Sequence, residues 1–199
     1  MTFICRKLTT QNIERILLKT LTVAIISDTH GFLDPRIAKI IQGCDYAVHA
    51  GDVMAAGVLE AMCPRSGRII AVAGNNDVPE NWSEFEADIL HQLPNVAELE
   101  LPGGILAVEH GHRHGHHAPR HDLLRRAHPQ ARAIAYGHSH QLICDQEENP
   151  WVINPGAAGR VRTHGGPSCL VLTAAHESWK FEAHRFPLHA EGSLTYERM

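Results

Sequence analysis

The sequence contains no closely spaced cysteine pair and no long apolar stretch. Its five cysteines lie far apart and form no Cys-x-x-Cys motif, which argues against a disulfide framework and against a cysteine-based zinc site. No segment approaches the roughly 20 apolar residues that span a bilayer. The net charge of −4 gives the chain no general attraction to nucleic acid or to an anionic membrane surface. These absences predict a soluble, cytoplasmic protein that does not act at membranes and for which nucleic acid is a disfavoured partner.

The length of 199 residues allows one domain with a sizeable core. We expect an N-terminal extension at residues 1–21, the domain at 22–186 and a C-terminal tail at 187–199. Residues 1–20 contain no long apolar segment and no small-residue cleavage site, so we expect no secretory signal. A short amphipathic helix, a mistaken start codon and a disordered lead-in all remain open for this segment. Four of the five cysteines adjoin apolar residues, and we interpret them as small core residues.

The first half of the chain alternates between strand and helix patterns. The apolar run at 21–26 predicts a strand buried on both faces. Helical spacing at 35–42 and 55–62 separates this run from further strands at 46–50 and 68–73. This alternation predicts a parallel sheet flanked by helices.

The second half has a hairpin pattern instead. Residues 96–101 and 105–108 flank Pro102-Gly103-Gly104, which is a turn signal. A helix at 120–127 and a strand at 132–136 follow. Two more antiparallel pairs are expected, at 142–145 with 151–153 and at 169–173 with 179–184. The fold class is therefore α/β, with two packed sheets and helices outside.

Polar residues follow five of these strands at the point where each strand ends. They are Asp28, Asp52, Asn75, His110 and His138. In open α/β sheets, ligands bind beyond the carboxyl ends of the strands, so we expect these side chains to converge. Residues two apart in an extended segment point the same way, which pairs Asp28 with His30 and His138 with His140. Carboxylate, imidazole and amide oxygen suit Mn, Fe, Zn, Co or Ni, and a carboxylate such as Asp52 can bridge two of them.

Six segments, in this order along the chain, resemble the motif series of the calcineurin-like metallophosphoesterases, in particular their small bacterial phosphodiesterase branch. They are Ser27-Asp28-Thr29-His30-Gly31, Ala50-Gly51-Asp52, Val72-Ala73-Gly74-Asn75-Asn76-Asp77, His110-Gly111-His112, Tyr136-Gly137-His138-Ser139-His140 and Ile153-Asn154-Pro155-Gly156. The resemblance runs from about residue 23 to 173. A single Gly-Asp or Gly-His pair carries little information, whereas the ordered series restricts one site.

The resemblance implies a four-layer sandwich of two mixed β-sheets flanked by helices, and two divalent metal ions, with Mn first and Fe, Ni, Zn or Co as alternatives. The first metal would be held by Asp28, His30 and His140. The second would be held by Asn75, His110 and His138, with Asp52 between the two. The implied activity is that of a phosphodiesterase, which hydrolyses a small phosphate ester with a metal-activated hydroxide and has Asp52, Asn75 and His112 as catalytic residues. A homo-oligomer remains open.

One position departs from the wider superfamily, many of whose members have a histidine immediately after the asparagine of the third motif. Here that residue is Asn76, which cannot act as a general acid at neutral pH. We therefore expect slow hydrolysis of esters with strongly basic leaving groups, unless His112 supplies the proton.

Several residues have a structural interpretation beside the functional one. Taken singly, an aspartate after a strand is more often a helix N-cap than a ligand. The histidines of the 112–121 segment could form an accessory metal tract, although a solvated loop is the simpler reading. Five arginines, Arg113, Arg120, Arg125, Arg126 and Arg132, could attract an anionic substrate or could line a solvated helix face. Arg160 and Arg162 approach the site only if their loop folds back, and Asp77 is expected to orient its neighbours rather than to bind metal.

Two other functional classes remain as alternatives. One is a non-catalytic scaffold, because a retromer subunit has this fold and serves mainly as an interaction platform. In that scaffold the metal-site residues are altered, whereas in this chain the set is complete. The other is a nuclease or nucleic-acid-binding protein that uses the arginine-rich helix, which the net charge opposes.

Overall fold

Strand β1 (Leu21–Ile26) sends alternate side chains into two different cores, as a strand buried on both faces must. Val23 and Ile25 face a core that they share with residues of the second sheet, such as Leu106. Ala24 and Ile26 face the opposite way and pack with helix residues such as Ile37. The two cores place β1 between a second sheet and a layer of helices. The computed structural model describes residues 20–188.

Two five-stranded sheets form the centre of the molecule. The first has the order β10-β9-β1-β2-β3 and the second the order β4-β5-β6-β8-β7. The remaining strands of the first sheet are β2 (Tyr46–His49), β3 (Ile69–Ala71), β9 (Ser168–Ala174) and β10 (Trp179–Arg185). Those of the second are β4 (Val96–Leu101), β5 (Gly104–Glu109), β6 (Ala133–Ala135), β7 (Leu142–Asp145) and β8 (Trp151–Pro155). Both sheets are mixed, because β1-β2-β3 and β5-β6-β8 run parallel and the other pairs run antiparallel.

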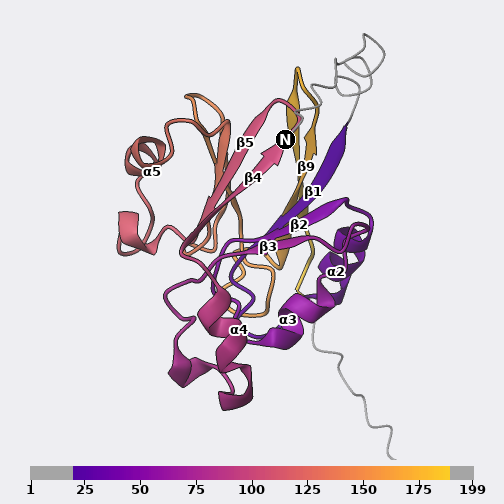
Figure 1. Cartoon of the computed structure of the whole chain (residues 1–199), viewed down its shortest axis with the longest axis vertical. Helices are drawn as coiled ribbons and strands as arrows, with labels where there is room; N and C mark the ends of the chain where they lie inside the picture. Colours follow the sequence, from indigo (N-terminus) through magenta and orange to yellow (C-terminus); the bar gives the residue numbers. More distant parts are fainter. Residues whose placement is uncertain (1–19, 189–199) are drawn as a thin grey trace, which may run out of the picture.

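Helices cover the outer face of each sheet. On the first sheet lie α2 (Pro35–Gln42), α3 (Ala56–Ala61) and α4 (Ala87–Gln92), whereas α5 (His121–Ala127) packs through Leu124 on the second (Figure 1). The expected four-layer sandwich of two mixed sheets between helices is therefore confirmed. All the expected strands and helices are present, with ends shifted by one or two residues.

Four short elements are absent from the sequence-based expectation: α4 and the 3-10 turns η1 (Pro79–Asn81), η2 (Glu84–Glu86) and η3 (His112–His114). A signal for η2 was available, because Ser83 and Glu86 form a capping box. The others are short, with six residues in α4 and three each in η1 and η3, so their geometry depends on contacts with the rest of the fold.

The interpretation of the cysteines as core residues is correct for Cys44 and Cys169, which are buried, and wrong for Cys63 and Cys144, which are exposed. Cys63 follows the buried cap residue Met62 and turns outward. Cys144 lies on β7, an edge strand of the second sheet. The expected extension (1–21), the tail (187–199) and Cys5 lie largely or wholly outside the described residues.

Candidate metal centre

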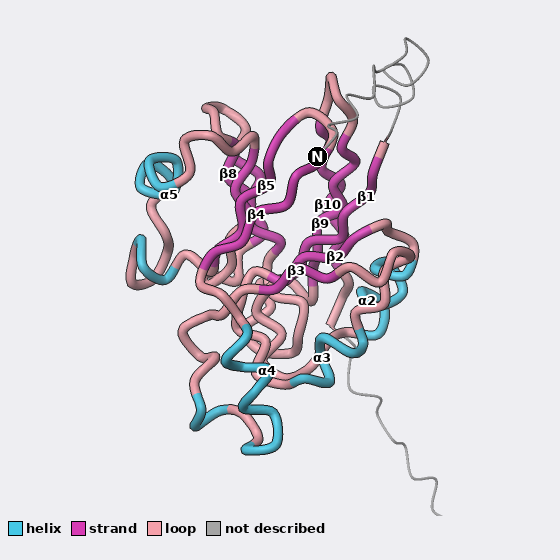
Figure 2. Tube along the Cα trace, in the orientation of Figure 1, coloured by secondary structure: helices cyan, strands magenta, loops and turns pink. Residues whose placement is uncertain are grey.

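The seven residues expected to bind metal lie on loops that follow the ends of β1, β2, β3, β5 and β6. Figure 2 shows loops gathered beyond one end of the strands. Backbone contacts hold these loops against one another. The amide of Asp28 donates to the carbonyl of Gly51 at 3.0 Å, and the amide of Gly137 donates to the carbonyl of His110 at 3.2 Å. The amide of His138 donates to the Asp28 carboxylate at 3.2 Å. Segments more than 100 residues apart in the chain therefore meet at this edge.

One group of side chains consists of Asp28, His30, Asp52 and His140, whose ligand atoms all lie within 4.8 Å of one another. His30 Nε2 and His140 Nε2 are 3.2 Å apart. His140 Nε2 lies 3.3 Å from Asp28 Oδ1, and His30 Nε2 lies 3.7 Å from Asp52 Oδ2. This spacing is that of a candidate metal-binding cluster.

A second group adjoins the first through the same Asp52 oxygen. His110 Nε2 lies 3.4 Å from Asp52 Oδ2 and 3.2 Å from Asn75 Oδ1. His138 Nδ1 lies 2.9 Å from the same Asn75 oxygen. Asp52 Oδ2 therefore faces both groups, which is the position that a bridging carboxylate requires.

Each of the four histidines directs one nitrogen into the site and uses the other to donate elsewhere. Nδ1–H of His110 donates to the Ala50 carbonyl at 2.8 Å, and Nδ1–H of His140 donates to the Val161 carbonyl at 3.1 Å. Nε2–H of His138 donates to the His116 carbonyl at 2.9 Å. His30 Nδ1 lies 3.1 Å from the sulfur of Met54. The site-facing nitrogens of neutral His30, His138 and His140 therefore carry lone pairs, as a metal-binding histidine must, whereas His110 offers one only after its Nε2 loses a proton.

Charge in the site is poorly balanced by protein groups alone. Burial raises the pKa of Asp28 to about 7. Burial by itself would lower the pKa of His110, but the carboxylates of Asp52 and Asp28 raise it to about 9. Burial opposes ionisation of Asp52 too, yet hydrogen bonds from His110 and Asn76 hold its pKa well below the usual range. A cation among these oxygens and lone pairs would replace the proton on His110 and favour ionised Asp28. The donor set therefore fits divalent metal.

Three of the four histidines, His30, His138 and His140, are held neutral. Burial, followed by the charge of Arg162, lowers the pKa of His140 to about 4. Burial also lowers the pKa of His30 and of His138. Neutral imidazole is the form that coordinates metal.

Five of the seven residues have left-handed backbone conformations, which are rare for residues other than glycine. They are Asp28 (φ 53°), His30 (φ 46°), Asp52 (φ 57°), His138 (φ 65°) and His140 (φ 56°). Each such residue costs about 1–2 kcal/mol. Strain of this kind gathers at functional sites, where it fixes side-chain directions.

This strain predicts an unusual order of stability for substitutions at His138. Both His138→Gly and His138→Ala remove the imidazole contacts, but only glycine relieves the left-handed backbone (φ 65°). In urea unfolding of the metal-free protein, we expect the glycine variant to be more stable by about 1 kcal/mol. At the neighbouring Ser139, which lacks a positive φ, the alanine variant should be the more stable. Equal free energies of unfolding for the two His138 variants would contradict the assignment of strain.

Two residues beyond the seven fix the position of Asp52 and its loop. Asn76 donates to Asp52 through both its backbone amide (2.9 Å) and its side chain (2.7 Å). Asp77 is buried and accepts hydrogen bonds from the amides of Val53, Met54 and Gly74. The expected orienting function of Asp77 agrees with these contacts. Sequence reasoning missed the contacts of Asn76, although its place beside Asn75 could have suggested them.

The loop after β8 (Trp151–Pro155) folds back onto the site. The amide of Ala158 donates to the Ser27 carbonyl at 2.9 Å, and Arg162 Nη2 lies 3.0 Å from His140 Nε2. Arg160 turns elsewhere, and its guanidinium lies 3.6 Å from the centre of the Phe32 ring. The sequence predicts that the two arginines approach the site only if their loop folds back. The loop does fold back, and it brings Arg162 to His140.

His112 lies at the edge of the second group. Its ring centre is 5.5 Å from that of His110 and 6.3 Å from that of His138. Its Nδ1 is buried and has no hydrogen-bond partner among residues 20–188. The side chain is thus near the candidate metal-binding atoms without contacting the carboxylates.

Three further histidines of the second half contact acidic groups. His114 and His128 contact Glu109 at 3.0 and 2.9 Å. His121 Nδ1 lies 2.6 Å from Asp145. Within the described part of the chain, these histidines form no further group of three potential ligands, which favours the simpler reading of the 112–121 segment.

The five arginines do not form a free basic patch. Four of them contact carboxylates, and Arg132 donates to the carbonyl of Gly103 at 2.8 Å. The four are Arg113 with Glu109, Arg120 and Arg126 with Asp122, and Arg125 with Asp145. These contacts weaken the case for capture of an anion by this face.

Between residues 20 and 188, no helix has the length and apolar character needed to cross a membrane.

Comparison with known proteins gives the family to which this chain is similar. Residues 21–177 match the family model described as the calcineurin-like phosphoesterase superfamily domain. A phosphodiesterase of Methanocaldococcus jannaschii, MJ0936, is 28% identical over 140 residues, which cover 67% of this chain and 82% of the relative.

Solved structures share the fold. A structure described as a novel archaeal phosphodiesterase has a TM-score of 0.61 and 22% identity, and covers 82% of this chain and 100% of that one. Vacuolar Protein Sorting 29 from Cryptosporidium parvum has a TM-score of 0.62 and 15% identity, and covers 85% of this chain and 99% of that one.

Proposed function

This chain belongs to the calcineurin-like phosphoesterase superfamily, and on that premise we propose that it is a phosphodiesterase that depends on two divalent metal ions. The observation that carries the proposal is the position of Asp52 Oδ2, 3.7 Å from His30 Nε2 and 3.4 Å from His110 Nε2. One carboxylate oxygen that faces two sets of lone pairs is what a dinuclear centre needs.

The proposed ligands divide as the two groups do. Asp28, His30 and His140 would hold one ion, Asn75, His110 and His138 the other, and Asp52 both. Bound in this way, two cations lower the pKa of a water and neutralise the charge of a phosphate. Manganese is the first choice, because the set combines oxygen and imidazole without thiolate.

The residues of the chain position this chemistry rather than take part in covalent steps. Asn76 holds Asp52 through two hydrogen bonds, so the bridging oxygen does not need to reorganise during the reaction. Arg162 lies beside His140, where its guanidinium would donate to a phosphate oxygen as negative charge develops. His112, whose ring centre lies 5.5 Å from that of His110, is the alternative proton donor to the leaving group that we propose to test, because Asn76 cannot donate one.

The first test is hydrolysis of bis-p-nitrophenyl phosphate and of its monoester counterpart. We expect a chelator to abolish activity, Mn²⁺ to restore it, and the diester to have the larger kcat/KM. Full activity in the presence of chelator, or the opposite substrate preference, would contradict the proposal.

A second test concerns the leaving group. Since Asn76 occupies the position after Asn75, we expect rates across phenyl phosphodiesters to fall steeply as the pKa of the departing phenol rises. If His112 supplies the proton, His112→Gln will steepen this dependence further. A flat dependence in the unmodified enzyme would show that a strong general acid is present after all.

A scaffold function without catalysis is disfavoured by the complete set of seven residues. Strong dependence of activity on salt with DNA or RNA as substrate would instead support a nuclease. We propose a reducing cytoplasm as the place of action, in keeping with the four free cysteines among residues 20–188.

A further inference from the structure

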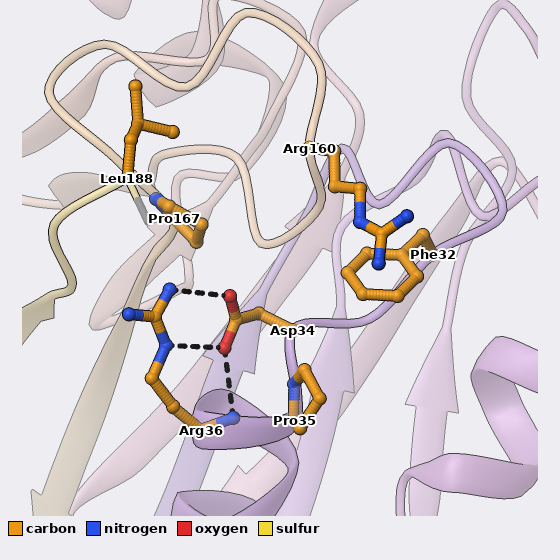
Figure 3. Close-up of a pocket in the computed structure, with 7 residues that line it drawn as sticks. All are labelled: Phe32, Asp34, Pro35, Arg36, Arg160, Pro167 and Leu188. Atoms are coloured by element: carbon orange, nitrogen blue, oxygen red, sulfur yellow. Dashed lines mark hydrogen bonds and ion pairs between the residues drawn. The ribbon is translucent and has the colours of Figure 1, made fainter. Parts of the chain in front are cut away.

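A cavity of about 680 Å³ is lined in part by two segments that also supply residues of the candidate metal centre or contact it. It is lined by Phe32, Asp34, Pro35, Arg36, Arg160, Pro167 and Leu188 (Figure 3). Its volume is within the range of about 300–1,000 Å³ that is usual for small-molecule sites. The cavity is therefore large enough for one substituent of a phosphate ester.

The chain connects this cavity directly to the metal centre. Phe32 follows His30 by two residues, in a turn closed by the hydrogen bond from the Phe32 amide to the Thr29 carbonyl (3.0 Å). Arg160 precedes Arg162 by two residues, and Arg162 contacts His140. Two residues span at most about 7 Å, so both walls of the cavity begin at the edge of the site.

The two arginines that line the cavity differ in what they bind. Arg36 makes a bidentate pair with Asp34, at 2.9 and 2.8 Å (Figure 3). Arg36 also donates to the Pro187 carbonyl. Its charge is therefore neutralised. Arg160 stacks on Phe32 at 3.6 Å, and its guanidinium has no carboxylate or carbonyl partner within residues 20–188.

The stacked guanidinium suits an anion. Its N–H groups match phosphate or carboxylate oxygens in a bidentate manner, and the Phe32 ring limits the rotation that binding would otherwise have to restrict. Pro35, Pro167 and Leu188 supply apolar surface in the lining. The lining thus combines one available positive charge with apolar walls.

We propose that this cavity receives the non-departing substituent of a phosphodiester and that Arg160 binds an anionic group on it. The substrate class is then a phosphodiester with an apolar or planar body and a second phosphate or carboxylate. This inference rests on the proposed function, because that function supplies the phosphoester at the metal centre.

The test uses two substrates that differ by one anion: the p-nitrophenyl ester of thymidine 5′-phosphate, with and without a 3′-phosphate. In the unmodified enzyme with Mn²⁺, we expect the 3′-phosphate to raise kcat/KM by about tenfold to a hundredfold, as one charge-assisted hydrogen-bond pair would. Arg160→Gln should bring this ratio close to one. Arg126→Gln, which removes the same charge from α5, should leave the ratio unchanged.

Arg162→Gln separates the two arginines, since it should slow both substrates and keep the ratio. An unmodified enzyme with a ratio near one, or an Arg160→Gln variant that keeps the full ratio, would overturn the inference while diester hydrolysis itself stands.

A binding measurement distinguishes the absence of an anion subsite at Arg160 from failure of the proposed phosphodiesterase function. By calorimetry with the Mn²⁺-loaded protein, thymidine 3′,5′-bisphosphate should bind at least tenfold more tightly than thymidine 5′-phosphate, and Arg160→Gln should remove the difference. If no ester is hydrolysed, the proposed function is wrong, and these affinities alone decide the subsite: equal affinities in the unmodified protein would reject it.

Discussion

Replacing Asp52 with asparagine is expected to reduce kcat/KM for bis-p-nitrophenyl phosphate by about 10³-fold or more. The carboxylate oxygen lies between the two groups of lone pairs, 3.7 Å from His30 Nε2 and 3.4 Å from His110 Nε2. A neutral amide offers one oxygen and no charge, so it would hold a pair of cations poorly. A loss of about 4 kcal/mol of transition-state stabilisation corresponds to this factor.

The same substitution should leave the fold intact. Asp52 accepts from the backbone amide of Asn76 at 2.9 Å, and an amide oxygen can accept this bond equally well. The new amide nitrogen would meet the side-chain amide of Asn76, which donates to Asp52 at 2.7 Å, and the variant would lose the negative charge that His110 faces. Thermal unfolding of the metal-free variant should therefore remain cooperative, at a lower temperature than that of the unmodified protein. Asp122→Asn, on the opposite helix layer, is the matched control for activity. An Asp52→Asn enzyme within tenfold of the unmodified one would exclude Asp52 as the bridge.

The second large effect is expected at Gly74. A β-carbon at this position would overlap the carboxylate and the backbone nitrogen of Asp52. The Asp52 carboxylate cannot move freely, because Asn76 donates a hydrogen bond to it. The backbone of Gly74 is also fixed, because its amide donates to Asp77. Gly74→Ala should therefore displace Asp52 and lower kcat/KM by about 10²-fold or more. It should also destabilise the protein by about 1–3 kcal/mol.

Gly57 provides the control for this experiment. It lies in α3, and a β-carbon there would meet no atom within 4 Å. Gly57→Ala should leave activity unchanged and, as a helical substitution, should stabilise the protein by up to about 1 kcal/mol. Full activity in Gly74→Ala would mean that the position of Asp52 is not critical for the reaction.

Much of the fold follows from local sequence patterns. The run at 21–26 predicts a strand buried on both faces because five of its six residues are apolar, and the two cores on either side of β1 explain that pattern. The ends of such strands also indicate where Asp28 and Asp52 would lie. These features depend on chain periodicity, which a sequence displays directly.

Other features depend on contacts between distant segments. The directions of Arg160 and Arg162 are set by a loop that binds Ser27 through Ala158, and nothing in the local sequence specifies that contact. The tautomer of His138 depends on the carbonyl of His116, 22 residues away. The exposure of Cys144 depends on the position of β7 at a sheet edge. In each case a long-range arrangement decides between local alternatives.

The most direct measurement of the central claim is the number and position of metal ions bound to the protein. Crystals grown with Mn²⁺ should give two anomalous peaks per chain, about 3.5–4 Å apart, on either side of Asp52 Oδ2. Asp28, His30 and His140 should surround one peak, and Asn75, His110 and His138 the other. A single peak, or none at saturating Mn²⁺, would contradict the account.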